Sequence, residues 1–259
     1  MRCVLNRFLA GTCVLAFVLV AFGAANAQEF NDFYVGGNAG VVSGRVSPLT
    51  APIFSPTGYF ATTSTPAITT ASAGQHFDPD RFTAGGQVGF THQWDTFVFG
   101  IEADFGKLTS NKTSSTTVTY PCCVTTNFTI TQATETSKLF TLRPRVGAAF
   151  GKVFVYGTAG AAFSHIKYSA LFTDTFATAH ESASFDSNEL GWVAGFGAEF
   201  RVAKHLSVKG EYLRVGFGDQ TISQNLTASV PPFTFPTNVF NHSVDVSLNV
   251  VRAGVNFRF

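Results

Sequence analysis

The charged residues with the clearest pattern occupy alternate positions in apolar stretches, as in Ile101-Glu-Ala-Asp-Phe105 and Leu142-Arg-Pro-Arg-Val146. Since successive side chains of a β-strand point to opposite faces, these charges are expected to share one face of a sheet. Both signs occur in similar number, and buried charges must pair because an unpaired buried charge is costly. The set comprises Glu102, Asp104, Arg143, Arg145, Glu199, Arg201, Lys209, Glu211, Arg252 and Arg258.

Two kinds of site fit such a set. The first is a structural salt-bridge network that fills the interior of a β-barrel, and we predict it for Glu102, Asp104, Arg143, Arg145, Glu199, Lys209, Glu211 and Arg252. The alternative is the gate of a narrow pore, formed by Arg143, Arg145 and the two carboxylates of the 101–105 stretch. The first interpretation predicts that Arg143→Ala leaves a carboxylate unpaired and weakens the fold.

Catalysis would require a nucleophile beside a base, or paired carboxylates. The candidates are His242-Ser243, Ser164-His165 and His180-Glu181. Neighbours in a strand point to opposite faces, so these pairs do not by themselves predict dyads. The six His show no metal-ligand spacing, and we expect no enzyme activity, metal or cofactor.

The elements that must position the charges are strands, because apolar and small or charged residues alternate with a period of two. Phe82, Ala84 and Gly86 alternate with Thr83 and Gly85, for example. The pattern predicts eight strands, at 33–42, 81–91, 97–106, 140–150, 153–166, 190–201, 206–217 and 243–259. For 153–166 the outward face stays open, and apparent phase changes near Leu213 and at Val250-Val251 predict β-bulges.

The connections between these strands alternate in length. Three are short, at 92–95, 151–152 and 202–204, whereas 43–80, 107–137, 167–187 and 219–242 are expected to be long, mobile loops rich in Thr, Ser and Pro. Strict alternation is required in an outer-membrane barrel, where periplasmic turns are short and extracellular loops are long. The sequence therefore predicts an all-β, eight-stranded, antiparallel, up-and-down transmembrane β-barrel.

Composition agrees with that fold. Of 259 residues, 29 are Phe and only 13% are charged, so a Phe-rich face can meet lipid while Gly makes room for charges inside. The formal net charge of +1 gives no electrostatic reason to expect a nucleic-acid partner. The adjacent Cys122 and Cys123 cannot form a disulfide framework, and the sequence leaves open whether they form a vicinal disulfide or two free thiols.

The two ends carry export signals. Arg2 and Arg7 precede an uncharged apolar run that ends in Ala25-Asn-Ala27, which predicts a signal peptide over 1–27 and a barrel domain over 28–259. No globular domain is expected after the barrel. At the C-terminus, Val255, Phe257 and Phe259 form one apolar face that ends on a terminal aromatic residue. This face looks like the C-terminal strand that the barrel insertion machinery recognises.

The strands resemble the small outer-membrane β-barrels of Gram-negative bacteria, the OmpA-like and opacity-like "porin family". The matching stretches are Phe33-Tyr-Val-Gly-Gly-Asn-Ala-Gly40, Thr83-Ala-Gly-Gly-Gln-Val-Gly89, Phe99-Gly-Ile-Glu-Ala-Asp-Phe105, Arg145-Val-Gly-Ala-Ala-Phe150, Tyr156-Gly-Thr-Ala-Gly160, Gly191-Trp-Val-Ala-Gly-Phe-Gly-Ala-Glu199 and Lys209-Gly-Glu-Tyr-Leu-Arg214. The resemblance implies location in the outer membrane, among lipid and lipopolysaccharide. A structural or surface-interaction role is expected, with loops that contact an extracellular ligand or host surface. The alternatives are a low-conductance porin and a lipid-modifying enzyme.

Overall fold

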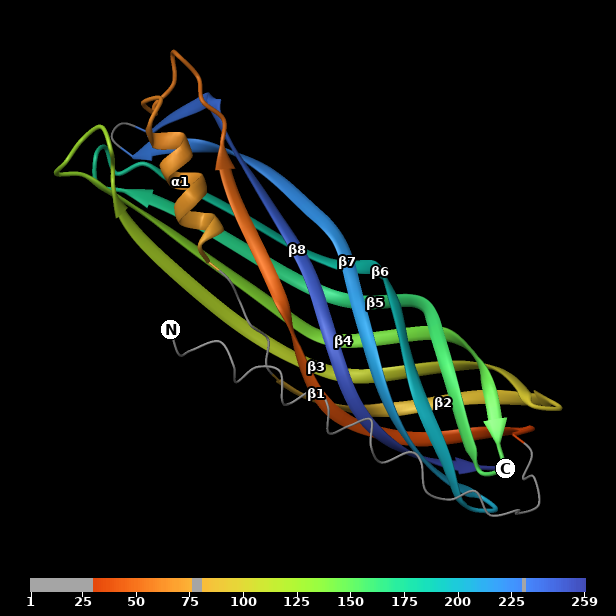
Figure 1. Cartoon of the computed structure of the whole chain (residues 1–259). Coiled ribbons are helices and arrows are strands. Elements are labelled where there is room, and N and C mark those ends of the chain that lie inside the picture. The colour runs from red at the N-terminus through yellow and green to blue at the C-terminus, as the bar shows by residue number, and fades with distance from the viewer. Residues whose placement is uncertain (1–29, 76–80, 230–231) are drawn as a thin grey trace, which may run out of the picture.

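Eight antiparallel strands close into one barrel in the computed structural model, which describes residues 30–75, 81–229 and 232–259 (Figure 1). Each strand pairs with the next in the chain, and the first pairs with the last. The predicted fold is thereby confirmed, while the predicted signal peptide lies outside the described residues. The elements are β1 (Asp32–Pro52), α1 (Ser64–Ala73), β2 (Arg81–Trp94), β3 (Phe97–Thr119), β4 (Asn127–Phe150), β5 (Val153–Asp174), β6 (His180–Ala203), β7 (Leu206–Ser229) and β8 (Pro232–Arg258).

Short turns join the strands at the end of the barrel where the C-terminus lies (Figure 1). They span residues 95–96, 151–152 and 204–205, slightly later than expected at the first and third. Asp95 and Gly151 have φ values of 55° and 61°, in the left-handed region that tight hairpin turns use. Because periplasmic turns of outer-membrane barrels are short, we assign these turns to the periplasmic side.

The opposite end corrects the prediction of long, mobile loops. Most residues of the four expected loops instead belong to the strands. β1 is 21 residues long, and β8 is 27 residues long. Between β3 and β4 only residues 120–126 leave the sheet, and between β5 and β6 only 175–179. Thr side chains sustain this pairing, because β-branched residues favour strands and bond across them, as Thr117 does with Thr129 at 2.9 Å.

Neither predicted phase change is a bulge. In β7 the inward positions run without interruption through Glu211, Leu213 and Val215. In β8 they continue in the same way through Val250 and Arg252. What changes is the character of the interior, which is charged near the periplasmic end and apolar beyond it. Register shifts occur at other positions, for example between Phe217 and Gln220 of β7 and between Thr136 and Leu139 of β4.

An apolar belt covers the outside of the periplasmic half of the barrel. Val155 and Phe163 of β5 belong to it, which settles the open question of facing: Phe154, Tyr156 and Ile166 point inward. A transmembrane strand needs only about 9–11 residues, so these strands extend well beyond the bilayer. No helix among the described residues is long and apolar enough to cross a membrane. The belt includes Phe33, Val41, Phe82, Phe99, Phe105, Phe140, Phe163, Leu190, Trp192, Phe196, Val251 and Phe257.

Helix α1 closes a seam in the protruding wall. The pairing of β1 with β2 ends at Val42 and Arg81, so the upper part of β1 has β8 on one side and no strand on the other within the described residues. α1 packs against this edge of β1 and also contacts β3 and β4 (Figure 1). Ser72 accepts a hydrogen bond from the Thr50 amide at 3.0 Å and donates one to the Thr50 carbonyl at 2.9 Å. The helix thereby satisfies backbone groups that an open edge would expose.

Candidate functional site

The predicted charges converge inside the periplasmic half of the barrel, with Glu102 near their centre. Its carboxylate accepts hydrogen bonds from Arg143 at 2.6 Å, from Lys209 at 2.7 and 2.8 Å, and from Arg145 at 3.2 Å. β3 and β4 place Glu102 and Arg143 directly opposite each other, and Lys209 reaches across from β7. Glu102, Arg143 and Arg145 are fully buried.

A second group of contacts links β3, β7 and β8. Arg252 donates to Asp104 at 2.9 Å and to Glu211 at 2.8 Å. Glu211 also lies 3.3 Å from the ammonium group of Lys209, and Asp104 accepts a hydrogen bond from Arg143 at 2.9 Å. The structure therefore joins these charges to the Glu102 group in one network.

The network continues to the periplasmic rim through Glu199. This carboxylate bonds to Arg145 at 2.8 Å and lies 3.1 Å from Arg258. Arg258 and Arg201 also bond to Asp32, which sequence reasoning missed because Asp32 immediately precedes the predicted first strand. Among the described residues, the network contains five carboxylates and six basic groups: Asp32, Glu102, Asp104, Glu199, Glu211, Arg143, Arg145, Arg201, Lys209, Arg252 and Arg258.

Two tyrosines, also missed, complete the hydrogen bonding. Tyr34 donates to Glu102 at 2.7 Å, and Tyr156 donates to Glu211 at 2.6 Å. A Cβ atom at Gly89 would lie 2.3 Å from the Tyr34 hydroxyl oxygen, and one at Gly197 would lie 2.6 Å from that of Tyr156. Glycine at these two positions therefore makes room for the tyrosine hydroxyls. Tyr34 occupies the polar face of its strand, which is the sequence signal that could have identified it.

Apolar side chains fill the barrel directly above the charges. Val42, Leu213, Leu248 and Val250 belong to one buried cluster that spans the interior. Nearer the extracellular end, Phe60, Phe128, Phe172 and Phe240 form a second cluster together with Ile68 of α1. The interior is therefore occupied at three successive levels.

Between the two apolar clusters lies a buried chain of polar groups that the sequence did not reveal. Thr50 Oγ1 is 2.9 Å from His242 Nδ1, and His242 Nε2 is 3.1 Å from Glu181 Oε2. The order hydroxyl, imidazole, carboxylate matches that of a hydrolase triad. All three side chains are nevertheless buried, at 0–2% exposure, so a substrate has no access to the hydroxyl.

The adjacent pairs considered for catalysis are separated by the barrel wall. Ser164 points inward and donates to the Lys138 carbonyl oxygen at 2.8 Å, whereas His165 lies on the outside, 2.9 Å from Asp186. His242 and Glu181 point inward and contact each other, whereas their sequence neighbours Ser243 and His180 point outward. In the part of the chain that the structure describes, no three His, Cys, Asp or Glu residues gather as metal ligands.

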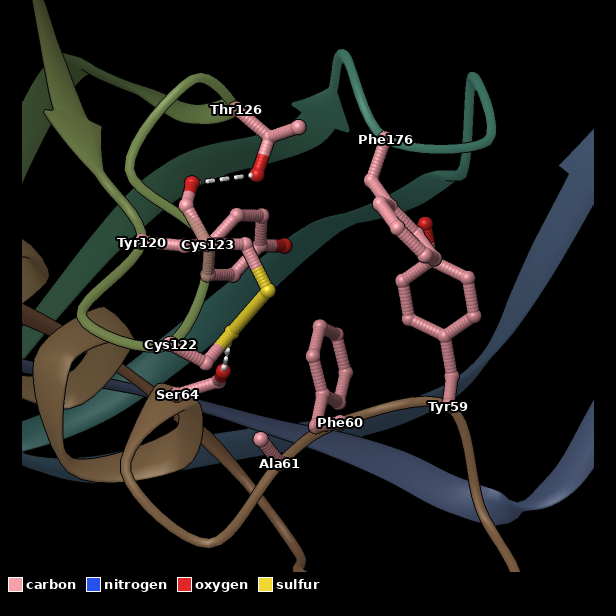
Figure 2. A pocket seen from close by; sticks show the side chains of 9 residues that line it. All are labelled: Tyr59, Phe60, Ala61, Ser64, Tyr120, Cys122, Cys123, Thr126 and Phe176. Atoms are coloured by element: carbon pink, nitrogen blue, oxygen red, sulfur yellow. Dashed lines mark hydrogen bonds between the residues drawn. A yellow bond between two sulfur atoms is a disulfide. The ribbon is translucent and has the colours of Figure 1, made fainter.

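The extracellular end carries a small pocket of about 100 Å³ (Figure 2). Three connections line it, and none of the lining residues is charged. Tyr59 and Phe176 face each other across one side with ring centroids 6.0 Å apart, and Cys122 and Cys123, joined by a disulfide, border the other. The lining residues are Tyr59, Phe60, Ala61, Ser64, Tyr120, Cys122, Cys123, Thr126 and Phe176.

One carboxylate holds the tyrosines of this pocket. Tyr59 and Tyr120 both donate to Asp174 Oδ2, at 2.7 and 3.1 Å. Burial raises the pKa of both phenols above the ordinary value, and the Asp174 carboxylate raises each further. Both hydroxyls therefore remain protonated donors at physiological pH, and the aromatic wall is fixed in place.

The predicted assembly residues lie on the outside of the last strand. Val255, Phe257 and Phe259 are exposed, and the Phe259 amide donates to the Phe33 carbonyl oxygen at 3.0 Å where β8 closes against β1. This position leaves the three side chains accessible on the outer surface of the barrel.

An apolar belt around paired strands, a charged interior and two-residue turns at one end define a small outer-membrane β-barrel. The family description "Outer membrane protein beta-barrel domain" matches residues 12–259, and the chain belongs to this family. It is located in the outer membrane of Gram-negative bacteria.

Curated relatives agree with this assignment. The chain is 28% identical over 181 residues to the 31 kDa outer-membrane immunogenic protein of Brucella melitensis, covering 69% of this chain and 66% of that protein. It is 29% identical over 142 residues to the 25 kDa outer-membrane immunogenic protein of Brucella abortus, covering 55% of each. The chain thus spans slightly less than two thirds of the first relative and just over half of the second.

Solved structures also align along most of the chain. OprG of Pseudomonas aeruginosa is 10% identical with a TM-score of 0.44, and the alignment covers 90% of this chain and 99% of OprG. Neisserial surface protein A is 10% identical with a TM-score of 0.35, covering 88% and 97%. Ail of Yersinia pestis is 14% identical with a TM-score of 0.32, covering 87% and 99%.

Proposed function

We propose that the protein is a non-conducting, non-enzymatic outer-membrane barrel whose protruding end presents a rigid contact surface to the outside. One observation carries the proposal: buried side chains occupy the interior at three levels, and the strands continue past the bilayer. The curated relatives are named immunogenic proteins, which supports exposure at the cell surface.

The filled interior disfavours the alternative of a low-conductance porin. Rearranging the charged network alone would not open a path, because the apolar cluster of Val42, Leu213, Leu248 and Val250 lies above it. An apolar constriction also excludes ions by dewetting. Opening a pore would therefore require both the charged network and the apolar side chains above it to rearrange.

Planar-bilayer recording tests this part of the proposal. We expect the purified protein to give no steady conductance. A variant in which residues 64–75 are replaced by a Gly/Ser linker should also remain closed, because the lower two levels remain in place. Steady conductance steps from the unmodified protein would contradict the proposal and favour the porin.

The pocket of Figure 2 is the proposed contact site for an extracellular partner or host surface. Aromatic side chains held by hydrogen bonds suit such a site, because rigid aromatic anchors provide contact area at little entropic cost. Burial of Thr50, His242 and Glu181 supports the absence of hydrolase activity, since their hydroxyl–imidazole–carboxylate chain cannot meet a lipid.

We also propose that residues 1–27 are removed during export and that Val255, Phe257 and Phe259 address the chain to the barrel insertion machinery. Intact-mass analysis of the protein from outer membranes tests the first point. A mature chain that begins at Gln28 is expected, and retention of residues 1–27 would contradict it.

A further inference from the structure

Basic side chains lie on the outer wall of the barrel just above the apolar belt. They are separate from both the interior network and the extracellular pocket. The clearest example is a hollow of about 580 Å³ on the outer faces of β1, β7 and β8. Arg45 and Arg214 border it from either side of β8, and Asp245, Ser247 and Asn249 lie between them.

The position of this hollow relative to the membrane follows from the strand register. Val41 and Val251, both exposed belt residues, are cross-strand partners. Ser43 and Asn249 pair one outward position above them, and Arg45 pairs with Ser247 at the next. At about 3.3 Å per residue along tilted strands, the hollow begins within a few ångströms of the hydrocarbon boundary. That is the level of the lipid headgroups.

A tyrosine marks the same boundary. Tyr212 lies on the outer face of β7 opposite Val251, and its hydroxyl donates to Asn249 Oδ1 at 2.7 Å. Aromatic residues with one polar end are enriched at membrane interfaces, because the ring meets lipid and the hydroxyl meets the headgroup layer.

The two guanidinium groups are available to a ligand. Arg214 is exposed and donates only to neutral oxygens, at 3.0 Å to Ser247 and 3.3 Å to Asn249. Arg45 is exposed too, and within the described residues neither arginine forms a salt bridge. Guanidinium groups prefer phosphate, whereas the Asp245 carboxylate and the Ser247 hydroxyl suit the hydroxyl groups of a sugar.

The same level carries a second basic pair. Lys107 of β3 and Lys138 of β4 are direct cross-strand partners on the outer face, one outward position above the belt pair Phe105 and Phe140. Like charges directly opposite each other destabilise a sheet unless an anion lies between them. No salt bridge to either lysine occurs in the described part of the chain, so this pair also lacks a protein counter-ion.

We infer that the hollow bordered by Arg45 and Arg214 binds the phosphorylated sugar headgroup of a glycolipid in the outer leaflet. The lipid chains would lie along the belt below, and the phosphate would bridge the two guanidinium groups. The inference depends on the position of the barrel in the membrane and is independent of the proposed contact role.

Native mass spectrometry of the folded protein, titrated with bisphosphorylated lipid A in detergent, tests this inference. Arg45→Gln/Arg214→Gln should lower the affinity at least about tenfold, since charge-assisted hydrogen bonds to phosphate are lost. The matched control is Lys152→Gln/Lys204→Gln, which removes the same charge from exposed periplasmic turns and should leave the affinity unchanged. Both double variants must keep the heat-modifiable mobility of a folded barrel.

Two further probes separate the sources of phosphate. Dephosphorylated lipid A should bind the unmodified protein weakly. Its affinity should equal that of lipid A for the Arg45→Gln/Arg214→Gln variant. Excess inorganic phosphate should not displace lipid A, because it lacks the sugar and the chains. Equal affinity of the two double variants, undiminished binding of dephosphorylated lipid A, or displacement by inorganic phosphate would each overturn the assignment.

Discussion

Each carboxylate of the interior network contacts at least two basic groups. Glu199, for example, lies between Arg145 and Arg258, and Asp32 lies between Arg201 and Arg258. Desolvating so many charges is costly, and the multiple hydrogen bonds of each group offset that cost. A change that removes one partner therefore leaves several charges with incomplete pairing.

Arg143→Ala tests the structural role of the network. Arg143 is fully buried and bonds to Glu102 and Asp104, so its loss should lower the free energy of unfolding by about 3–5 kcal/mol. Urea titration of the folded protein in detergent measures the effect. Lys152→Ala, in an exposed turn, is the control and should not change the midpoint. An unchanged midpoint for Arg143→Ala would contradict a stabilising network.

Gly89→Val tests the close approach of Tyr34. The new Cβ would lie 2.3 Å from the Tyr34 hydroxyl oxygen and 2.7 Å from the Ile101 carbonyl oxygen, so the interior would be overpacked. A loss of about 1–3 kcal/mol in unfolding free energy is expected by the same titration. Gly157→Val has no atom within 4 Å of its Cβ and should be tolerated. Equal midpoints for the two variants would show that the space at Gly89 is not needed.

The sequence could predict some residues of the site and not others, depending on the position of each residue in its strand. Alternation placed Glu102, Arg143 and the other charges on one face, because the opposite face is apolar. Asp32 gave no such signal, since it stands at the edge of its strand. The contact between His242 and Glu181 joins β8 to β6 across the interior, and the spacing of residues along the chain does not contain that information.

At the scale of elements, the membrane halves of the strands were predictable and the protruding halves were not. Lipid imposes a strong hydropathy contrast between the two faces of a strand. Above the belt that contrast is weak, as in 107–119 of β3, where Thr and Ser occur on both faces. The protruding strands are instead rich in β-branched residues, which favour strands. Composition alone, however, fits a mobile loop equally well.

Ser72→Ala tests how α1 is held against β1. The substitution removes both hydrogen bonds to the Thr50 backbone, and a buried amide left unsatisfied costs about 1–3 kcal/mol. Faster hydrogen exchange is expected in α1, with the belt strands unchanged. Thr69→Ala removes a hydroxyl that bonds only within the helix and should have a smaller effect. If the two variants exchange alike, the Ser72 bonds do not hold the helix.

Phe259→Ser separates assembly from stability. Phe259 is 72% exposed at the end of the chain, so its side chain contributes little packing to the folded barrel. The variant should accumulate several-fold less in outer membranes and yet refold in detergent with an unchanged urea midpoint. Val208→Ser, an exposed apolar position in the neighbouring strand, is the control and should assemble at the normal level. Normal membrane levels of Phe259→Ser would contradict the assembly signal.

At the scale of the whole molecule, the barrel inverts its polarity where it leaves the membrane. Within the belt, Glu102 points inward and Ile101 points to lipid. Above it, Ile130 points inward and Thr131 points to water. The inversion explains the apparent phase change at Val250-Val251: the strand keeps its alternation, and only its surroundings change. The protruding part is therefore stabilised by apolar burial, as in a water-soluble β-protein.

Labelling of single cysteines in intact cells tests this arrangement. In a Cys122→Ser/Cys123→Ser background, a membrane-impermeant maleimide should label Ser115→Cys, on the outer face of β3 far above the belt. Ile101→Cys should resist the reagent because lipid covers it, and Lys152→Cys should react only after the outer membrane is permeabilised. Labelling of Lys152→Cys in intact cells would reverse the orientation. Protection of Ser115→Cys would show that the upper strands do not reach the water outside the cell.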